Sequence, residues 1–182
     1  MSTLRVNSII NSDSTSSNLN VPDLSRLVRE TAQTTTSGTS KDFSSIPSWV
    51  QKITVMFQNI SLSGTDNFLI QLEDSGGVET TGYISSSNFL QGGVSSGGVS
   101  STSGIILSGG NASNTLSGTV VFNNISGNFW IATGTWNYSN LTGINGWTAG
   151  EKELSSTLTS IRITASGANT FDLGSVNIMY EG

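Results

Sequence analysis

The sequence predicts an all-β protein, an antiparallel β-sandwich of jelly-roll type that follows a short N-terminal arm. Three observations lead to this fold class. Apolar residues come in short bursts of β-branched and aromatic type, which pack well on a pleated sheet. Gly occurs 21 times and Pro only twice, and Gly-containing turns separate the bursts. Charged residues make up only 10% and hydrophobic residues 35%, whereas disordered chains combine low hydrophobicity with high charge.

Residues 1–30 differ in pattern from residues 31–182, so we expect an arm followed by one sandwich domain. Within the arm, 4–10 predicts a strand, 11–20 a polar loop, and 21–30 a short helix with apolar residues at helical spacing. Such an arm has too little apolar surface to fold alone, so we expect it to dock on a partner or on other copies of the chain. The residues that we expect to mediate this assembly are Leu4, Val6, Ile9, Leu24, Leu27 and Val28.

In the sandwich domain, the alternation of Ile53, Val55 and Phe57 with Thr54 and Met56 predicts a strand with one apolar face. Residues 84–104 are low in complexity and rich in Ser and Gly, which favours a mobile loop or an irregular excursion. The other strands that we expect cover 68–72, 105–107, 119–122, 129–136, 160–165 and 175–180, with a further strand or short turn at 151–155.

The predicted core contains the apolar side of each strand. Trp130 and Trp136 are six positions apart and therefore share a face of a continuous strand, which is more often core than binding surface. The residues that we expect in the core are Phe43, Ile46, Trp49, Ile53, Val55, Phe57, Ile70, Leu72, Val121, Phe122, Trp130, Ile161, Ile163, Val176 and Ile178.

Composition and charge exclude several classes of protein. The chain has no Cys, so it has no disulfide framework. Its net charge is −5, which does not supply the basic surface that nucleic-acid binding needs. No apolar run has the length of a membrane span, and the N-terminus lacks a basic and then apolar signal region. We therefore expect no nucleic-acid partner, no membrane insertion and assembly in a cell's cytoplasm.

Two parts of the domain resemble a module of phage tail-fibre and related virion proteins. Leu158 to Tyr180 is similar to the closing hairpin of that family, and the likeness covers roughly residues 31–181. The first part runs from Thr31 to Tyr83 and contains, in order, Phe43, Ile46-Pro47-Ser48-Trp49, Ile53 to Phe57, Leu69 to Gly77, and Glu79 to Tyr83.

The resemblance implies a role in the virion tail. Fibre proteins of this kind are homotrimers with parallel subunits, and short openings like that of residues 1–30 precede their trimeric shaft or anchor them to the particle. We therefore expect a tail fibre that attaches through its arm, is assembled in the host cytoplasm, and recognises a host cell-surface polysaccharide. The alternatives are a capsid decoration or tail collar protein, and a free carbohydrate-binding module.

The residue inventory weakens an enzymatic reading. The chain has no His, which with the lack of Cys removes Ser-His-Asp and Cys-His catalysis and zinc sites of the usual kinds. Paired carboxylates could still hydrolyse glycosides, and Glu73, Asp74 and Glu79 could contribute to a Ca²⁺ site. However, Glu73 and Asp74 precede Gly76-Gly77 and indicate a solvated strand end. We expect no catalytic residue, no metal and no cofactor.

Aromatic and amide side chains around the stretch Ser139 to Gly146 suit sugar recognition. Aromatic rings stack on the apolar faces of sugars, and amides bind their hydroxyl groups. The alternative is that these side chains cover one end of the sandwich or a subunit contact. The Gly-rich segment Gln91 to Gly98 is a competing site. The glycan-binding residues that we expect are Trp136, Asn137, Tyr138, Asn140, Asn145 and Trp147.

Overall fold

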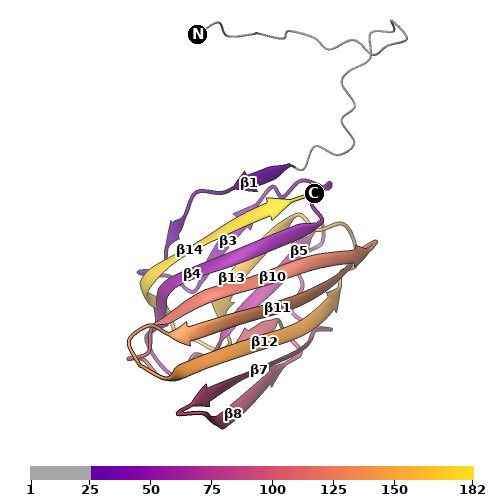
Figure 1. Cartoon of the computed structure of the whole chain (residues 1–182). Coiled ribbons are helices and arrows are strands. Elements are labelled where there is room, and N and C mark those ends of the chain that lie inside the picture. The colour runs from indigo at the N-terminus through magenta and orange to yellow at the C-terminus, as the bar shows by residue number, and fades with distance from the viewer. Residues whose placement is uncertain (1–25) are drawn as a thin grey trace, which may run out of the picture.

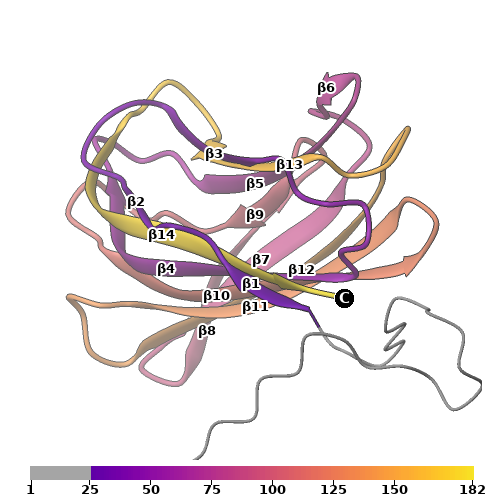
Figure 2. The ribbon, with the colours of Figure 1, turned by 90° about the horizontal axis from the view of Figure 1, so that it is seen from above.

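The computed structural model of the chain describes residues 26–182, which form two antiparallel sheets packed face to face (Figures 1 and 2). The predicted all-β antiparallel sandwich is therefore confirmed. The first sheet, here called the large sheet, has nine strands, and the second, the small sheet, has five. Figure 2 shows β3, β13 and β5 of the small sheet lying across the inner face of the large sheet.

The large sheet extends from a short strand at one edge to a hairpin at the other (Figure 1). In spatial order it contains β1 (Leu27–Arg29), β14 (Phe171–Glu181), β4 (Lys52–Leu62), β10 (Leu116–Ser126), β11 (Phe129–Tyr138), β12 (Ile144–Glu153), β7 (Ile84–Gln91) and β8 (Val94–Ser101), and β2 (Gln33–Thr34) also pairs with β14. The small sheet contains β3 (Ser40–Ser44), β13 (Ser160–Ala165), β5 (Phe68–Asp74) and β6 (Gly77–Val78), and β9 (Ile105–Leu107) also pairs with β5.

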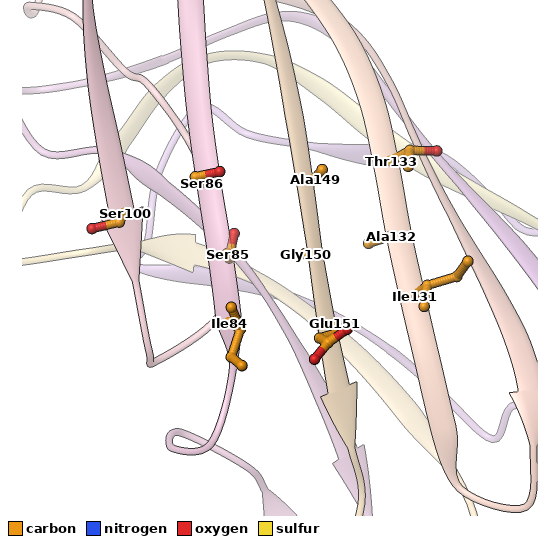
Figure 3. Close-up of a pocket in the computed structure, with 10 residues that line it drawn as sticks. All are labelled: Ile84, Ser85, Ser86, Ser100, Ile131, Ala132, Thr133, Ala149, Gly150 and Glu151. Atoms are coloured by element: carbon orange, nitrogen blue, oxygen red, sulfur yellow. The ribbon is translucent and has the colours of Figure 1, made fainter.

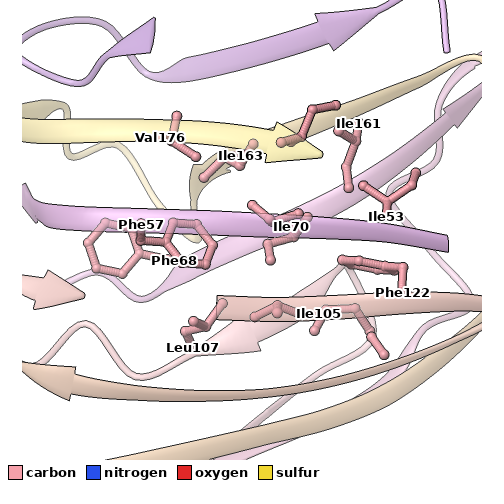
Figure 4. Packing of buried hydrophobic residues seen from close by; sticks show 14 of the residues in the cluster. Ile53, Phe57, Phe68, Ile70, Ile105, Leu107, Phe122, Ile161, Ile163 and Val176 are labelled. Atoms are coloured by element: carbon pink, nitrogen blue, oxygen red, sulfur yellow. The ribbon is translucent and has the colours of Figure 1, made fainter. Parts of the chain in front are cut away.

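The hydrophobic core lies between the two sheets (Figure 4). Alternation along each strand sends apolar side chains inward, so Ile53 and Val55 on β4 are fully buried against Ile70 and Ile163 of the small sheet's strands. The predicted core is confirmed except at Trp49 and Val121, which are half-buried.

Both exceptions have a geometric reason. Val121 points to the outer face of the large sheet because its neighbours on β10, Val120 and Phe122, are fully buried. Trp49 lies in a turn after β3, where its ring centroid is 5.9 Å from that of Tyr180. The guanidinium of Arg26 lies 5.3 Å from the centre of the Trp49 ring. Trp49 therefore covers one end of the core, with one side of its ring open to a cation.

The helix predicted over 21–30 is wrong where the structure describes it, because Leu27–Arg29 forms strand β1 and pairs with β14. Ladder hydrogen bonds to the edge of β14 outweigh the weak helical preference of so short a segment. Val28 packs against the core, while Leu27 is exposed. These two predicted assembly residues therefore belong to the sandwich, whose first strand begins inside the predicted arm. Leu4, Val6, Ile9 and Leu24, with the predicted strand 4–10 and loop 11–20, lie outside the described residues.

Residues 84–104 are also different from the prediction, because they form the β7–β8 hairpin rather than an irregular loop. The turn is made by Gly92 and Gly93, both with positive φ, which is the geometry of the tightest hairpin turns. Ser85 and Ser87 are buried on the inner face of β7. Buried and exposed residues therefore alternate along this strand, but the buried positions hold serine instead of apolar residues. The competing segment Gln91 to Gly98 is consequently the tip of this hairpin.

The remaining strand predictions are confirmed in β5, β9, β10, β11, β13 and β14. Some strands are longer than predicted, since β10 covers Leu116–Ser126 and β14 covers Phe171–Glu181. The prediction at 151–155 differs in position, since β12 starts earlier, at Ile144, and ends at Glu153. This long strand lies between β11 and β7 and places a continuous row of alternating residues across the large sheet.

Strand β1 is expected to contribute measurably to stability. Asn177 Nδ2 donates to the Glu30 carbonyl, and Tyr180 Oη donates to Glu30 Oε1, each at 2.9 Å. Deleting residues 1–30 should therefore lower the free energy of unfolding by about 2 kcal/mol, through lost burial of Val28 and lost hydrogen bonds. The reference for this comparison is the chain without residues 1–25, which keeps β1 and Glu30. Urea unfolding of both truncated chains checks this, and equal stabilities would contradict it.

Candidate functional site

The centre of the candidate site is β12, whose inner side includes the glycines Gly146 and Gly150. Gly146 lies opposite Trp136 of β11, and a Cβ at Gly146 would overlap the Trp136 indole. The ring therefore lies directly against the β12 backbone. Only glycine permits this close approach, so β12 and β11 are held together by a large buried ring.

Three aromatic side chains pack together beneath this part of the sheet. The ring centroid of Trp136 is 5.2 Å from that of Tyr138 and 6.0 Å from that of Phe89. Trp136 Nε1 donates to Ser87 Oγ at 3.3 Å, and Ser87 Oγ donates to the Trp147 carbonyl at 3.0 Å. Aromatic packing and these hydrogen bonds fix the positions of β11, β12 and β7 relative to one another.

On the outer face of the same strands, Trp147 is the exposed aromatic residue, with 42% of its surface accessible. Thr135 on β11 and Asn88 on β7 are its cross-strand neighbours. One pair further along, Asn145 lies directly opposite Asn137. Side chains of directly opposed residues lie about 5 Å apart, so one indole and several amide and hydroxyl groups are within reach of one small ligand.

Three adjoining hollows lie along this face, and Trp147 lines two of them. The first has a volume of about 560 Å³ and lies between β11, β12 and β7, where Ser86, Ala149 and Thr133 stand side by side (Figure 3). The second, of about 420 Å³, shares Ser86 and Ala149 with the first and is bounded by Trp147. The third, of about 490 Å³, lies on the other side of Trp147. We call this continuous surface, from Asn145 to Glu151 of β12 with its neighbours on β11, β7 and β8, the β12 surface.

The β12 surface is hollow because the residues at its centre are small. Ala149 pairs with Thr133 on one side and Ser86 on the other, and Ser86 pairs with Ser100 on β8. At the end of the first hollow, Glu151 lies between Ile84 and Ile131 (Figure 3). A depression with a few polar groups between larger side chains is the usual form of a small-ligand site.

Of the six residues predicted to bind a glycan, the structure brings three together on the β12 surface: Asn137, Asn145 and Trp147. Trp136 and Tyr138 are buried, with 3% and 2% of their surface accessible, so their rings cannot stack on a ligand. The prediction of binding is therefore wrong for these two, and the alternative prediction of a core role is correct for Trp136. They belong to the aromatic cluster that supports the surface from below.

Asn140 also has a role within the fold. Its Oδ1 accepts a hydrogen bond from the Thr115 amide at 3.0 Å, and its Nδ2 donates to the Ser113 carbonyl at 2.6 Å. Both amide atoms are therefore used to fasten the β11–β12 loop to the segment before β10. The sequence alone missed Asn88 and Glu151, because β7 had been taken for a loop and β12 for a short element. It missed Thr135 because only the pairing of β11 with β12 places this residue beside Trp147.

A second polar cluster lies at the opposite end of β12, in the segment from Asp74 to Tyr83 that carries part of the tail-fibre resemblance. The Glu79 carboxylate lies 2.5 Å from Lys152 Nζ, and both side chains are largely buried. The Lys152 ammonium also lies 5.4 Å from the centre of the Tyr83 ring. Tyr83 is buried, and its Oη accepts a hydrogen bond from the Leu72 amide at 2.7 Å.

Asp74 is buried at a turn, which corrects the prediction of a solvated strand end. Its Oδ1 accepts from the Gly76 amide at 2.7 Å, and its Oδ2 accepts from Ser155 Oγ at 2.6 Å and the Ser156 amide at 2.8 Å. These hydrogen bonds, that of Ser155 above all, lower the pKa of Asp74 to about 2. Every oxygen of this carboxylate thus has a partner within the fold.

Lys152 and Ser155 act on Glu79 in the same direction. The hydrogen bond from Lys152 is the main cause that lowers the pKa of Glu79, and burial opposes it. Among residues 26–182, no group of three or more acidic side chains is placed to hold a metal ion. Nor does a helix long and apolar enough for a membrane span occur in this part of the chain.

The tail-fibre resemblance rests on the sequence segments quoted above. No protein-family model matches the chain, and neither does any curated protein. The family therefore stays a prediction, and the site is defined by its geometry alone.

The Lys152–Glu79 pair is expected to be far more important for stability than an exposed pair. Lys152→Met leaves a largely buried carboxylate without its cation and should lower the free energy of unfolding by about 3 kcal/mol. The matched control is Lys52→Met, which breaks the exposed Lys52–Glu181 pair and should cost less than about 1 kcal/mol. Urea unfolding measures both, and similar effects of the two substitutions would contradict the structural role of Lys152.

Asp74 should make the fold sensitive to acid. Its folded pKa of about 2 lies below its ordinary value of 3.8, so its contribution is complete above pH 3.8 and is lost as pH falls towards 2. Asp74→Asn should be less stable than wild type at neutral pH and should lose less further stability over that acidic range. Thermal unfolding at a series of pH values tests this, and parallel pH profiles of the two proteins would refute it.

Proposed function

We propose that this protein is a non-enzymatic component of a phage tail fibre that recognises glycans on the host cell surface through the β12 surface. The observation that carries the proposal is the exposed Trp147 with Asn137, Asn145 and Asn88 around it, on a hollowed sheet face. An indole ring stacks on the apolar face of a sugar, and amides exchange hydrogen bonds with its hydroxyl groups.

Several polar side chains of this surface are available to a ligand, although the Asn88 Oδ1 already accepts a hydrogen bond from the Phe89 amide at 2.8 Å. Within the described part of the chain, Asn137, Asn145 and Thr135 donate and accept no side-chain hydrogen bond, and neither does the Trp147 indole. The aromatic cluster beneath holds the strands rigidly, so little conformational entropy is lost when these groups bind. Pre-organised polar groups beside an exposed ring favour recognition over a purely structural role.

The position of the surface in the fold also supports a host-contacting role. Strand β1, where the described residues begin, and strand β8 are at opposite edges of the large sheet (Figure 1). β12 is five strands away from β1, or about 24 Å at the usual strand spacing. Attachment to other tail proteins through the N-terminal arm would therefore leave the β12 surface accessible.

A homotrimer is part of this proposal. Three copies on one fibre multiply a weak interaction, so a single site needs only millimolar affinity, about −4 kcal/mol. Hydrolysis of the bound glycan would require two carboxyl groups on either side of the scissile bond. Among residues 26–182, Glu151 is the one acidic residue that lines the three hollows, which supports binding without cleavage.

A second candidate is a structural virion protein, such as a capsid decoration or tail collar. The exposed Ile84 and Val94, each 70% accessible on the outermost hairpin, favour it, because such residues suit a protein contact. Antibody labelling of particles separates the two, since label over the head alone favours decoration. A free carbohydrate-binding module is the third candidate, and its gene would not lie among tail or head genes.

The role of Trp147 can be tested by host-cell adsorption. The fluorescently labelled full-length protein, with its mass in solution determined first by light scattering, is compared with Trp147→Ala. We expect the substitution to reduce cell binding at least tenfold, because stacking on a sugar is lost. Leu173→Ala is the matched control, since it also removes an exposed apolar side chain, on β14, and should leave binding unchanged. Unchanged adsorption by folded Trp147→Ala would contradict the proposed function.

A further inference from the structure

The β12 surface has a distinctive charge distribution. The described side chains that line its three hollows carry a single formal charge, the carboxylate of Glu151, and are otherwise hydroxyl, amide, aliphatic or aromatic. Glu153 adds a second negative charge on the same side of β12 beyond the first hollow. The electrostatic potential at this surface is therefore negative, in a chain whose net charge is −5.

The cations of the described residues lie elsewhere or are already paired. Arg26 and Arg29 lie at the β1 edge of the large sheet, and Lys41 is on β3 of the small sheet. Lys52 is three strands from β12, about 14 Å at the usual spacing. The other described cations form ion pairs with acidic side chains: Lys52–Glu181, Lys152–Glu79 and Arg162–Asp42. A carboxylate, sulfate or phosphate group on a ligand would meet Glu151 without a compensating cation from residues 26–182.

The length of the surface bears on the size of the ligand. Trp147 and Glu151 are four residues apart on one strand and therefore on the same face, about 13 Å from each other. The small residues between them, Ala149 with Thr133 and Ser86 beside it, leave an open path from one to the other. A single sugar residue cannot contact both ends at once, whereas a short chain of sugars can.

We propose, building on the function proposed above, that the ligand is an uncharged oligosaccharide that lies along β12 and contacts both Trp147 and Glu151. Trp147 stacks on one sugar residue, and the Glu151 carboxylate accepts hydrogen bonds from hydroxyl groups of another. The two oxygens of a carboxylate can accept several hydrogen bonds, and the hydroxyl groups of a neutral sugar supply several donors. The same carboxylate repels anionic polysaccharides and so contributes to specificity.

The test uses the full-length protein displayed at high density on beads, so that millimolar single-site affinities are detectable. The probes are an immobilised panel of neutral polysaccharides (dextran, mannan, galactan and rhamnan) and anionic ones (alginate, polysialic acid and polyglycerol phosphate). Each is measured with wild type, Trp147→Ala, Glu151→Gln and the control Leu173→Ala, at about 0.01 M and about 1 M ionic strength, where the Debye length is about 30 Å and about 3 Å.

The expected result is binding to one or more neutral probes that changes less than about twofold with ionic strength. Trp147→Ala should abolish this binding, Glu151→Gln should weaken it several-fold, and Leu173→Ala should leave it unchanged. Soluble oligosaccharides of the bound probe should compete better than its monosaccharide.

Four outcomes would overturn the inference. Binding to an anionic probe that Trp147→Ala abolishes would show a glycan site of the wrong charge class, so the proposed function would stand and this inference would fail. Neutral binding that depends on Trp147 but not on Glu151 would contradict the extended ligand. Lack of binding to every probe, or binding that Trp147→Ala leaves intact, would contradict the proposed function together with the inference.

Discussion

The architecture depends on one packing constraint: a five-stranded sheet has to bury the inner face of a nine-stranded one. Over β14, β4 and β10 the aliphatic residues of both sheets meet directly (Figure 4). The inner faces of β12 and β7 are buried differently. The short strand β9 contacts both of them, and the large rings of Trp136, Tyr138 and Tyr83 fill the remaining space. The buried Lys152–Glu79 pair lies beside Tyr83 and completes this region. The uneven cover explains why aromatic residues are concentrated there.

The same constraint determines what the outer face can present. Because side chains alternate along β12, Gly146, which admits the Trp136 ring, and Gly150 lie on the inner side, and Trp147, Ala149 and Glu151 lie on the outer side. Ala149 is small, so a depression forms between its larger neighbours. The residues that pack in the core and the residues that would contact a ligand thus lie on opposite faces of the same strand. Substitutions on the inner side of β12 would therefore alter the geometry of the outer side.

The sequence predicted those parts of the fold in which apolar residues themselves mark the period of two, as Ile53, Val55 and Phe57 do on β4. It did not predict β7, where buried Ser85 and Ser87 take the inner positions and no hydrophobic signal remains. Nor did it predict β1, because the pairing partner of Leu27–Arg29 is β14, at the other end of the chain. At the site, alternation along β11 predicts that Asn137 lies on the opposite face of the sheet from its neighbours Trp136 and Tyr138. Which of the two faces is buried depends on tertiary packing, here on the contact between Trp136 and Gly146.

The most direct measurement of the central claim is a map of ligand contacts in solution by two-dimensional NMR of the nitrogen-15-labelled protein. The indole N–H signals report separately on the exposed Trp147 and the buried Trp130 and Trp136. On addition of a host-surface oligosaccharide, the account predicts that the Trp147 indole and the side-chain amides of Asn137 and Asn145 shift together, while the buried indoles move little. Shifts confined to the small sheet or to β1, with the Trp147 signal unchanged, would contradict a recognition role for the outer face of β12.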